Sequence, residues 1–208
     1  LELGINIKSV TCDFFMENPP WKNGELTRKE LIDSLQRIGQ AAEVLGNLVL
    51  VIPIVDNSSL KSGGDFADIL LLLEQVGMDR FPISIAFESD LDPIALKELI
   101  SDLPAEKFGI NLDTGNSASL GYEPKVELEN YGDRVLNVHL KDRRVGGGSV
   151  RFGFGDVNFP EYLRGLEGMG YSGNFILQSY RSPEGAHLAE LLYSRNYLEL
   201  ARTSGISS

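Results

Sequence analysis

The chain has 208 residues, of which 42% are hydrophobic and 24% charged, as is typical of a globular protein with one sizeable core or two small ones. Its 30 acidic residues outnumber 19 basic ones, giving a net charge of −11, which argues against a nucleic-acid partner because phosphate affinity depends mainly on basic side chains. The single cysteine excludes a disulfide framework and favours a reducing, cytoplasmic compartment, and every apolar run is far shorter than the ~20 residues of a membrane helix.

Six strand–helix units are predicted along the chain. In chain order they are strand 5–15 and helix 27–46, strand 47–55 and helix 65–77, strand 82–88 and helix 92–103, strand 108–113 and helix 124–132, strand 135–140 and helix 158–170, and strand 173–178 and helix 184–202. The strands are rich in β-branched and aromatic residues and nearly continuously apolar, which is typical of strands buried on both faces of a parallel sheet. Gly46, Gly77 and Gly170 follow helices, as the left-handed cap requires, and Asp92 and Asn158 stand at helix starts.

This regular alternation predicts a parallel α/β fold, for which the open doubly wound sheet and the closed (β/α)8 TIM barrel are the two candidates. An open sheet that binds a dinucleotide would carry G-x-G-x-x-G after its first strand, whereas the glycine-rich segment 146–155 follows the fifth strand and lacks that spacing. Eight units of about 35 residues suit a barrel. We therefore expect residues 1–208 to form a single TIM-barrel domain that is N-terminally incomplete and lacks the first one or two βα units.

Four predicted strands end in side chains that can bind a metal ion. The third strand ends in Glu88, the fourth in Asp113 and the sixth in Gln178, and the fifth carries His139. In a parallel barrel these residues lie at the C-terminal mouth, where active sites are built. Taken singly, each has a structural explanation, as a helix N-cap or a core residue. Together they predict a site for one divalent ion, with Mn²⁺, Mg²⁺, Co²⁺ and Zn²⁺ all suited to the donors.

The segments IAFES, GINLDTGNS, NVHLKDR and FILQSY resemble the sugar phosphate isomerase/epimerase family, the xylose isomerase-like TIM barrels. The resemblance spans about residues 4–202 and is most specific in LDTGN and VHLKD. It implies that Glu88, Asp113 and His139 are metal ligands, with Gln178 at the place of a fourth ligand that is commonly Glu. In the family's epimerases two glutamates remove and return a proton. Gln178 can offer its carbonyl oxygen but cannot act as a base, so Glu88 is the predicted catalytic residue.

Three further residues are predicted to bind substrate. Asn116 stands where many family members have His, and it can hydrogen-bond a sugar hydroxyl but cannot transfer a proton. Lys141 and Arg143 follow the metal histidine, and by resemblance a cation here contacts hydroxyl or phosphate oxygens; a solvated loop is the alternative. The glycines of segment 146–155 have two interpretations, a phosphate site built from backbone N–H groups or a flexible lid.

The predicted function is a metal-dependent isomerase or epimerase of carbohydrate metabolism. It would act on a small-molecule sugar or sugar phosphate by abstracting a proton next to a carbonyl or hydroxyl that binds the metal. One alternative is a metal-dependent dehydratase of a cyclic polyol or related acid, which also needs only a metal and one base. Another is a catalytically inactive sugar-binding barrel, which Gln178 and Asn116 motivate. Neither nucleic acid nor membrane is an expected partner, and assembly into a homo-oligomer is left open.

Overall fold

The computed structural model describes residues 4–22, 25–182 and 185–203. The chain divides into two compact units, each described below by itself. The first consists of Leu1–Leu91 and Leu99–Ile110, and the second of Asp92–Glu98 and Asn111–Ser208.

The main sheet has six strands in the order β1-β2-β3-β4-β5-β8. Their bounds are Ser9–Thr11 (β1), Leu48–Ile54 (β2), Ile83–Ser89 (β3), Phe108–Asp113 (β4), Val135–Leu140 (β5) and Phe175–Leu177 (β8). Within the first unit β1 pairs with β2, and β2 with β3, both in parallel, and within the second unit β5 pairs with β8 in parallel. Five of these six strands lie within the predicted strand segments, and β3 extends one residue beyond its segment, to Ser89, which confirms the parallel α/β sheet.

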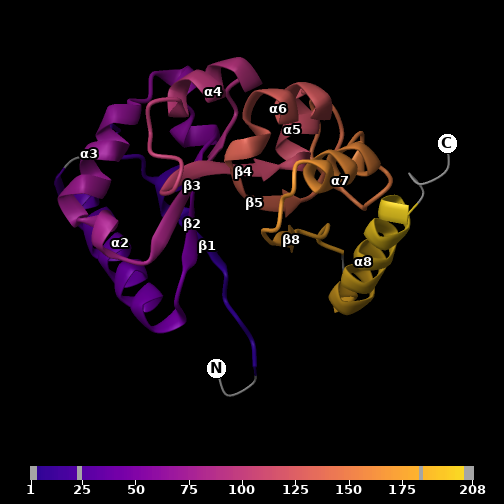
Figure 1. Ribbon diagram of the computed structural model, residues 1–208, viewed down its shortest axis with the longest axis horizontal. Coiled ribbons are helices and arrows are strands. Elements are labelled where there is room, and N and C mark those ends of the chain that lie inside the picture. Colours follow the sequence, from indigo (N-terminus) through magenta and orange to yellow (C-terminus); the bar gives the residue numbers. More distant parts are fainter. Residues whose placement is uncertain (1–3, 23–24, 183–184, 204–208) are drawn as a thin grey trace. The chain divides into compact units, whose positions relative to one another are not determined.

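In the first unit, helices cover β2 and β3. The helices are α1 (Phe14–Glu17), α2 (Glu25–Leu45) and α3 (Phe66–Val76). Helices α2 and α3 pack against each other beside these strands (Figure 1). Leu31 and Leu35 of α2 and Leu72 of α3 are fully buried, because the apolar residues of each helix recur at helical spacing on one face. Helix α3 begins where Asp65 accepts a hydrogen bond from Ala67 N (2.9 Å) and ends at Gly77, whose φ is 70°.

The second unit holds most of α4 (Pro93–Ile100) together with four helices. These are α5 (Thr114–Leu120), α6 (Pro124–Tyr131), α7 (Phe159–Gly168) and α8 (His187–Thr203). Asp92 and Asn158 cap α4 and α7 as predicted, through hydrogen bonds to Ala95 N and Glu161 N. Helix α6 packs on α7, and α7 on α8 (Figure 1). A separate antiparallel pair, β6 (Asp142–Arg143) with β7 (Ser149–Val150), follows β5.

The structure departs from the sequence-based expectation at the two shortest helices. The strand expected over 5–15 is confined to β1, and Phe14 and Phe15 belong to α1 instead. Helix α5 was not predicted, because its sequence TGNSASL consists mostly of residues with modest or poor helix propensity. Within the described residues, no helix is both long enough and apolar enough to cross a membrane.

A buried carboxylate ties three helices of the second unit together. Glu127 of α6 accepts hydrogen bonds from Ser117 of α5 (2.7 Å), Tyr131 of α6 and Tyr162 of α7. Burial raises the pKa of the Glu127 carboxyl group, and these three hydroxyl donors act in the opposite direction. The helices are therefore joined by a polar cluster inside an otherwise apolar interface.

This cluster makes stability depend on pH in a specific direction. Because the pKa of Glu127 is raised on folding, the folded protein holds a proton at pH values where an unfolded glutamate, with a pKa of about 4.3, has lost it. The contribution of Glu127 to stability therefore falls as the pH rises from that value through the raised pKa. We expect the difference in free energy of unfolding between wild type and Glu127→Gln, measured in urea, to decline over this range. Glu129→Gln, at an exposed site on the same helix, is the control; a difference that stays constant with pH would contradict the prediction.

Candidate metal centre

Asp113 combines a structural role with a candidate ligand role. It is the last residue of β4 and is 3% exposed. Its Oδ1 accepts a hydrogen bond from Asn116 N (2.9 Å), which caps helix α5. Its Oδ2 accepts from Lys141 Nζ (2.9 Å) and lies 3.9 Å from His139 Nδ1. The N-cap and ligand interpretations are therefore compatible, since a different oxygen serves each.

The structure brings His139 and Gln178 to the same place. His139 of β5 is 3% exposed, and its Nδ1 lies 3.1 Å from Gln178 Nε2. Gln178 follows β8 directly, and its backbone N–H donates to Leu140 O (2.9 Å), which extends the β5–β8 pairing. Asp113 and Gln178 thus both lie beside His139 in the second unit, and their role as metal ligands stays a prediction.

Glu88 lies in the first unit, one residue before the end of β3. Its side chain is buried within a strand that is buried almost throughout. Glu88, Asp113 and His139 are all buried, and each offers an oxygen or nitrogen atom that can bind a metal ion.

Of the three predicted substrate-binding residues, Lys141 and Asn116 contact Asp113, and Arg143 contacts Asn116. Arg143 Nη1 donates to Asn116 Oδ1 (2.8 Å), and Arg143 Nε and Nη2 donate to Gly147 O (3.1 and 2.9 Å). Lys141 is about a quarter exposed and pairs with Asp113. The structure therefore holds Asn116 and Arg143 against each other, and their contact with a substrate stays a prediction.

The motifs LDTGN and VHLKD contact each other through hydrogen bonds and close packing. Thr114 Oγ1 donates to Lys141 O (2.9 Å) and accepts from Lys141 N (3.1 Å), so the first turn of α5 is tied to the chain beyond β5. Gly115 leaves room for the Lys141 side chain, because a Cβ atom at Gly115 would lie 2.9 Å from Lys141 Cγ. The small residues of the first motif thus position the cation of the second.

Asp142 organises the glycine-rich segment. Its buried carboxylate accepts hydrogen bonds from Gly153 N (2.8 Å), Gly155 N (3.0 Å) and Val157 N (3.4 Å). Burial raises the pKa of Asp142, and these backbone N–H groups act in the opposite direction. The N–H groups expected to bind phosphate at Gly153 and Gly155 are therefore occupied by a carboxylate of the protein itself.

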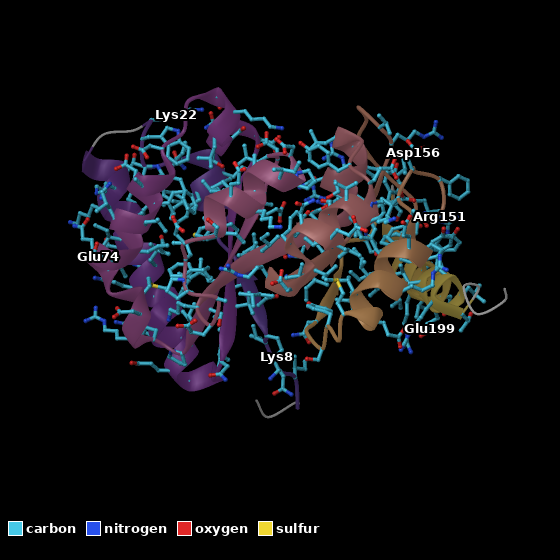
Figure 2. All side chains as sticks on the ribbon, turned by 45° about the horizontal axis from the view of Figure 1, so that its top comes forward. Lys8, Lys22, Glu74, Arg151, Asp156 and Glu199 are labelled. Atoms are coloured by element: carbon cyan, nitrogen blue, oxygen red, sulfur yellow. The ribbon has the colours of Figure 1, made fainter. Side chains whose placement is uncertain are left out.

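The same segment is anchored to α8, which argues against a flexible lid here. Arg151 Nε lies 3.1 Å from Glu190 Oε2, and the Arg151 guanidinium stacks 3.8 Å above the ring centre of Tyr193. Phe152 is fully buried against Phe159 and within reach of Tyr197. In Figure 2, Arg151 marks the segment and Asp156 is the residue that directly follows it.

Two glycines of this segment offer a direct comparison. A Cβ atom at Gly155 would lie 2.1 Å from Asp142 Oδ1, whereas a Cβ atom at Gly148 would have nothing within 4 Å. We expect Gly155→Ala to lower the free energy of unfolding by about 1–3 kcal/mol through overpacking, and Gly148→Ala to change it by less than about 0.5 kcal/mol. Urea unfolding of both variants measures this; equal effects would show that Asp142 does not organise the segment.

Two buried asparagines next to the candidate ligands were not predicted. Asn111 Nδ2 lies 3.1 Å from His139 Nδ1, and Asn137 Nδ2 donates to Asn111 Oδ1 (2.7 Å). Asn111 precedes Asp113 by two residues, and Asn137 precedes His139 by two. Because alternate residues of a strand share a face, a polar residue two positions before each candidate ligand was the available signal.

Comparison with known proteins connects this arrangement to one family. A family model described as xylose isomerase-like TIM barrel matches residues 4–197. The rhizopine catabolism protein MocC of Rhizobium meliloti is 26% identical over 132 residues, which cover 53% of this chain and 41% of that protein. The chain spans less than half the length of the curated relatives it matches.

Solved structures extend the likeness over nearly the whole chain. A D-tagatose 3-epimerase-like protein aligns with a TM-score of 0.71 at 22% identity, over 98% of this chain and 80% of that one. The IOLI protein with a bound zinc atom aligns with a TM-score of 0.73 at 18% identity, over 98% and 79%. At these identities the likeness shows the fold alone, and with the family model it confirms the predicted TIM-barrel fold class.

Proposed function

The chain belongs to the xylose isomerase-like TIM barrel family, and on that premise we propose that it is a metal-dependent isomerase or epimerase of a sugar or sugar phosphate. The observation that carries the proposal is the convergence of Asp113, His139 and Gln178 at the ends of three strands. Such strand ends form the catalytic face of a TIM barrel.

The donor chemistry of these residues fits a divalent cation. Asp113 Oδ2 and the Gln178 amide both lie next to His139 Nδ1. The carboxylate and the imidazole are buried, and the amide is partly buried. Asp113, His139, Gln178 and the buried Glu88 would hold the ion, and because the Gln178 amide faces His139 with Nε2, it would turn to offer Oε1. Mn²⁺, Mg²⁺, Co²⁺ and Zn²⁺ all accept such donors, and the IOLI structure carries zinc. When bound, the cation would withdraw electron density from a substrate oxygen and so acidify the neighbouring C–H bond.

Glu88 is the proposed proton-transfer group. A carboxylate can remove a proton from the carbon next to a carbonyl and return it to the adjacent carbon. Gln178 cannot share this task, because a carboxamide does not ionise near neutral pH. Transfer by a single base within one face of the substrate corresponds to aldose–ketose isomerisation, which is the form of the reaction that this residue set supports best.

Lys141, Arg143 and Asn116 are proposed to bind the oxygens of the substrate. Lys141 is partly exposed beside Asp113, and Arg143 is oriented by Asn116 Oδ1 and Gly147 O. A guanidinium held in this way is preorganised for hydroxyl or phosphate oxygens, since less side-chain entropy is lost on binding.

The amide of Gln178 is also compatible with a second function. A dehydratase acting on a cyclic polyol or related acid needs a metal and one base, so an amide at this place does not hinder it. The two reactions differ in products: an isomerase incorporates solvent deuterium into an isomer of the same composition, whereas a dehydratase releases water. Turnover of a polyol with loss of water would replace the isomerase proposal.

Metal binding is the first test. We expect isothermal titration calorimetry to detect binding of Mn²⁺, Mg²⁺, Co²⁺ or Zn²⁺ to the EDTA-treated protein. Asp113→Asn should weaken this binding by tenfold or more, while the asparagine keeps the ability to cap α5. Asp133→Asn, which removes an exposed carboxylate from the same unit, is the matched control. If the wild-type protein binds none of the four ions, the metal proposal is wrong.

Proton transfer is the second test. With a panel of ketoses and ketose phosphates in deuterated buffer, we expect Glu88→Gln to lower the rate of deuterium incorporation by a factor of about 10² or more. Glu106→Gln, at an exposed site in the same unit, should leave the rate unchanged. Full turnover by Glu88→Gln would remove Glu88 from the catalytic role.

A further inference from the structure

A chain of two buried amides leads to the ring of His139. Asn137 Nδ2 donates to Asn111 Oδ1 (2.7 Å), and Asn111 Nδ2 lies 3.1 Å from His139 Nδ1. Both asparagines are almost fully buried. We propose that Asn111 and Asn137 are positioning residues that keep the proton of neutral His139 on Nε2, so that Nδ1, beside Asp113, carries a lone pair that a cation would take over from the Asn111 N–H group. The part of this inference that concerns the cation rests on the proposed function.

The direction of the hydrogen bonds determines the tautomer. A side-chain amide has an acceptor oxygen and a donor NH₂ group. Because Asn111 Oδ1 accepts from Asn137, the NH₂ group of Asn111 is the one that faces His139. A ring nitrogen that faces an NH₂ group acts as an acceptor, so the proton of the neutral ring is on the other nitrogen, Nε2.

The unpaired oxygen of Asn137 supports hydrogen bonds that run from Asn137 to Asn111 to His139, and not the reverse order. Asn137 Oδ1 is buried and has no hydrogen-bond partner among the described residues. In the reversed chain Asn137 Oδ1 would accept from Asn111, and the Asn137 NH₂ group would take the place without a partner. A buried N–H group without an acceptor is rarer in proteins than an under-satisfied carbonyl oxygen, because it gives up hydrogen bonds to water without replacement. The observed direction therefore leaves the less costly group unpaired.

The nitrogen kept free of a proton is the one that faces the other candidate ligands. His139 Nδ1 lies 3.9 Å from Asp113 Oδ2 and 3.1 Å from the Gln178 amide. A cation binds the lone pair of an unprotonated ring nitrogen, and here it would displace the N–H groups of Asn111 and Gln178 that face this lone pair. If the proton sat on Nδ1, binding would require it to move to Nε2 first. Residues that set the orientation and tautomer of a ligating histidine typically change metal affinity by 10- to 100-fold.

The tautomer can be measured in the wild-type protein without any metal. The chain has two histidines, His139 and His187, so ¹H–¹⁵N correlation spectra of the imidazole rings contain two sets of signals. His187→Gln identifies the signals of His139. In EDTA-treated protein, at a pH where both rings are neutral, we expect the His139 proton on Nε2. A proton on Nδ1 would overturn the inference.

Asn137→Asp tests the chain directly. A carboxylate at position 137 only accepts hydrogen bonds, so Asn111 would turn its NH₂ group toward it and present Oδ1 to His139. We expect the proton to move to Nδ1 and the affinity for Mn²⁺ to fall by tenfold or more. Asn130→Asp adds the same charge at a partly exposed site on α6 and should change neither property.

The outcomes separate the two proposals. A tautomer that is unchanged in folded Asn137→Asp would overturn the role of the amide chain, and if that variant does not fold, the wild-type spectrum decides alone. Absence of Mn²⁺ binding to the wild-type protein would overturn the metal proposal, while a proton on Nε2 would still support the role of the asparagines.

Discussion

The second unit depends on the hydrogen bonds and the ion pair that the Asp113 carboxylate forms. One oxygen caps α5, and the other accepts from Lys141 and lies close to His139. The end of β4, the start of α5 and the segment that follows β5 are therefore fixed by a single buried side chain. Because a buried carboxylate without partners is strongly unfavourable, these donors must stay in place. The carboxylate that caps α5 thus also holds Lys141 beside it and lies close to His139 in the candidate metal centre.

Other carboxylates of this unit are satisfied internally as well. Asp142 binds backbone N–H groups of the glycine-rich segment, and Glu127 binds hydroxyl groups from three helices. Each one joins residues that are distant in sequence. The acidic composition thus has a structural component in addition to surface charge, and it gives Gly153 and Gly155 a role in folding the chain around an internal anion.

Several side-chain amides lie around the candidate metal centre. By the resemblance seen in the sequence, Gln178 and Asn116 stand where the family commonly has Glu and His, and Asn111 and Asn137 form the buried chain behind His139. An amide keeps hydrogen-bond geometry but neither carries charge nor transfers a proton. Because these amides cannot act as bases, Glu88 is the proton-transfer group of the proposed reaction. The reaction would therefore use a single base.

The sequence by itself determined the six strands, the six longest helices, and the strand-end positions of Glu88, Asp113 and His139, because apolar periodicity and helix caps act between near neighbours. Lys141 and Arg143 follow β5, and their contact with a substrate stays a prediction. Helix α5 was not predictable in this way, since its poor helix formers depend on the cap from Asp113 and the contact with Lys141. The partners of Asp142, Arg143 and His139 were decided only by tertiary structure, because each lies on another element that folding brings close.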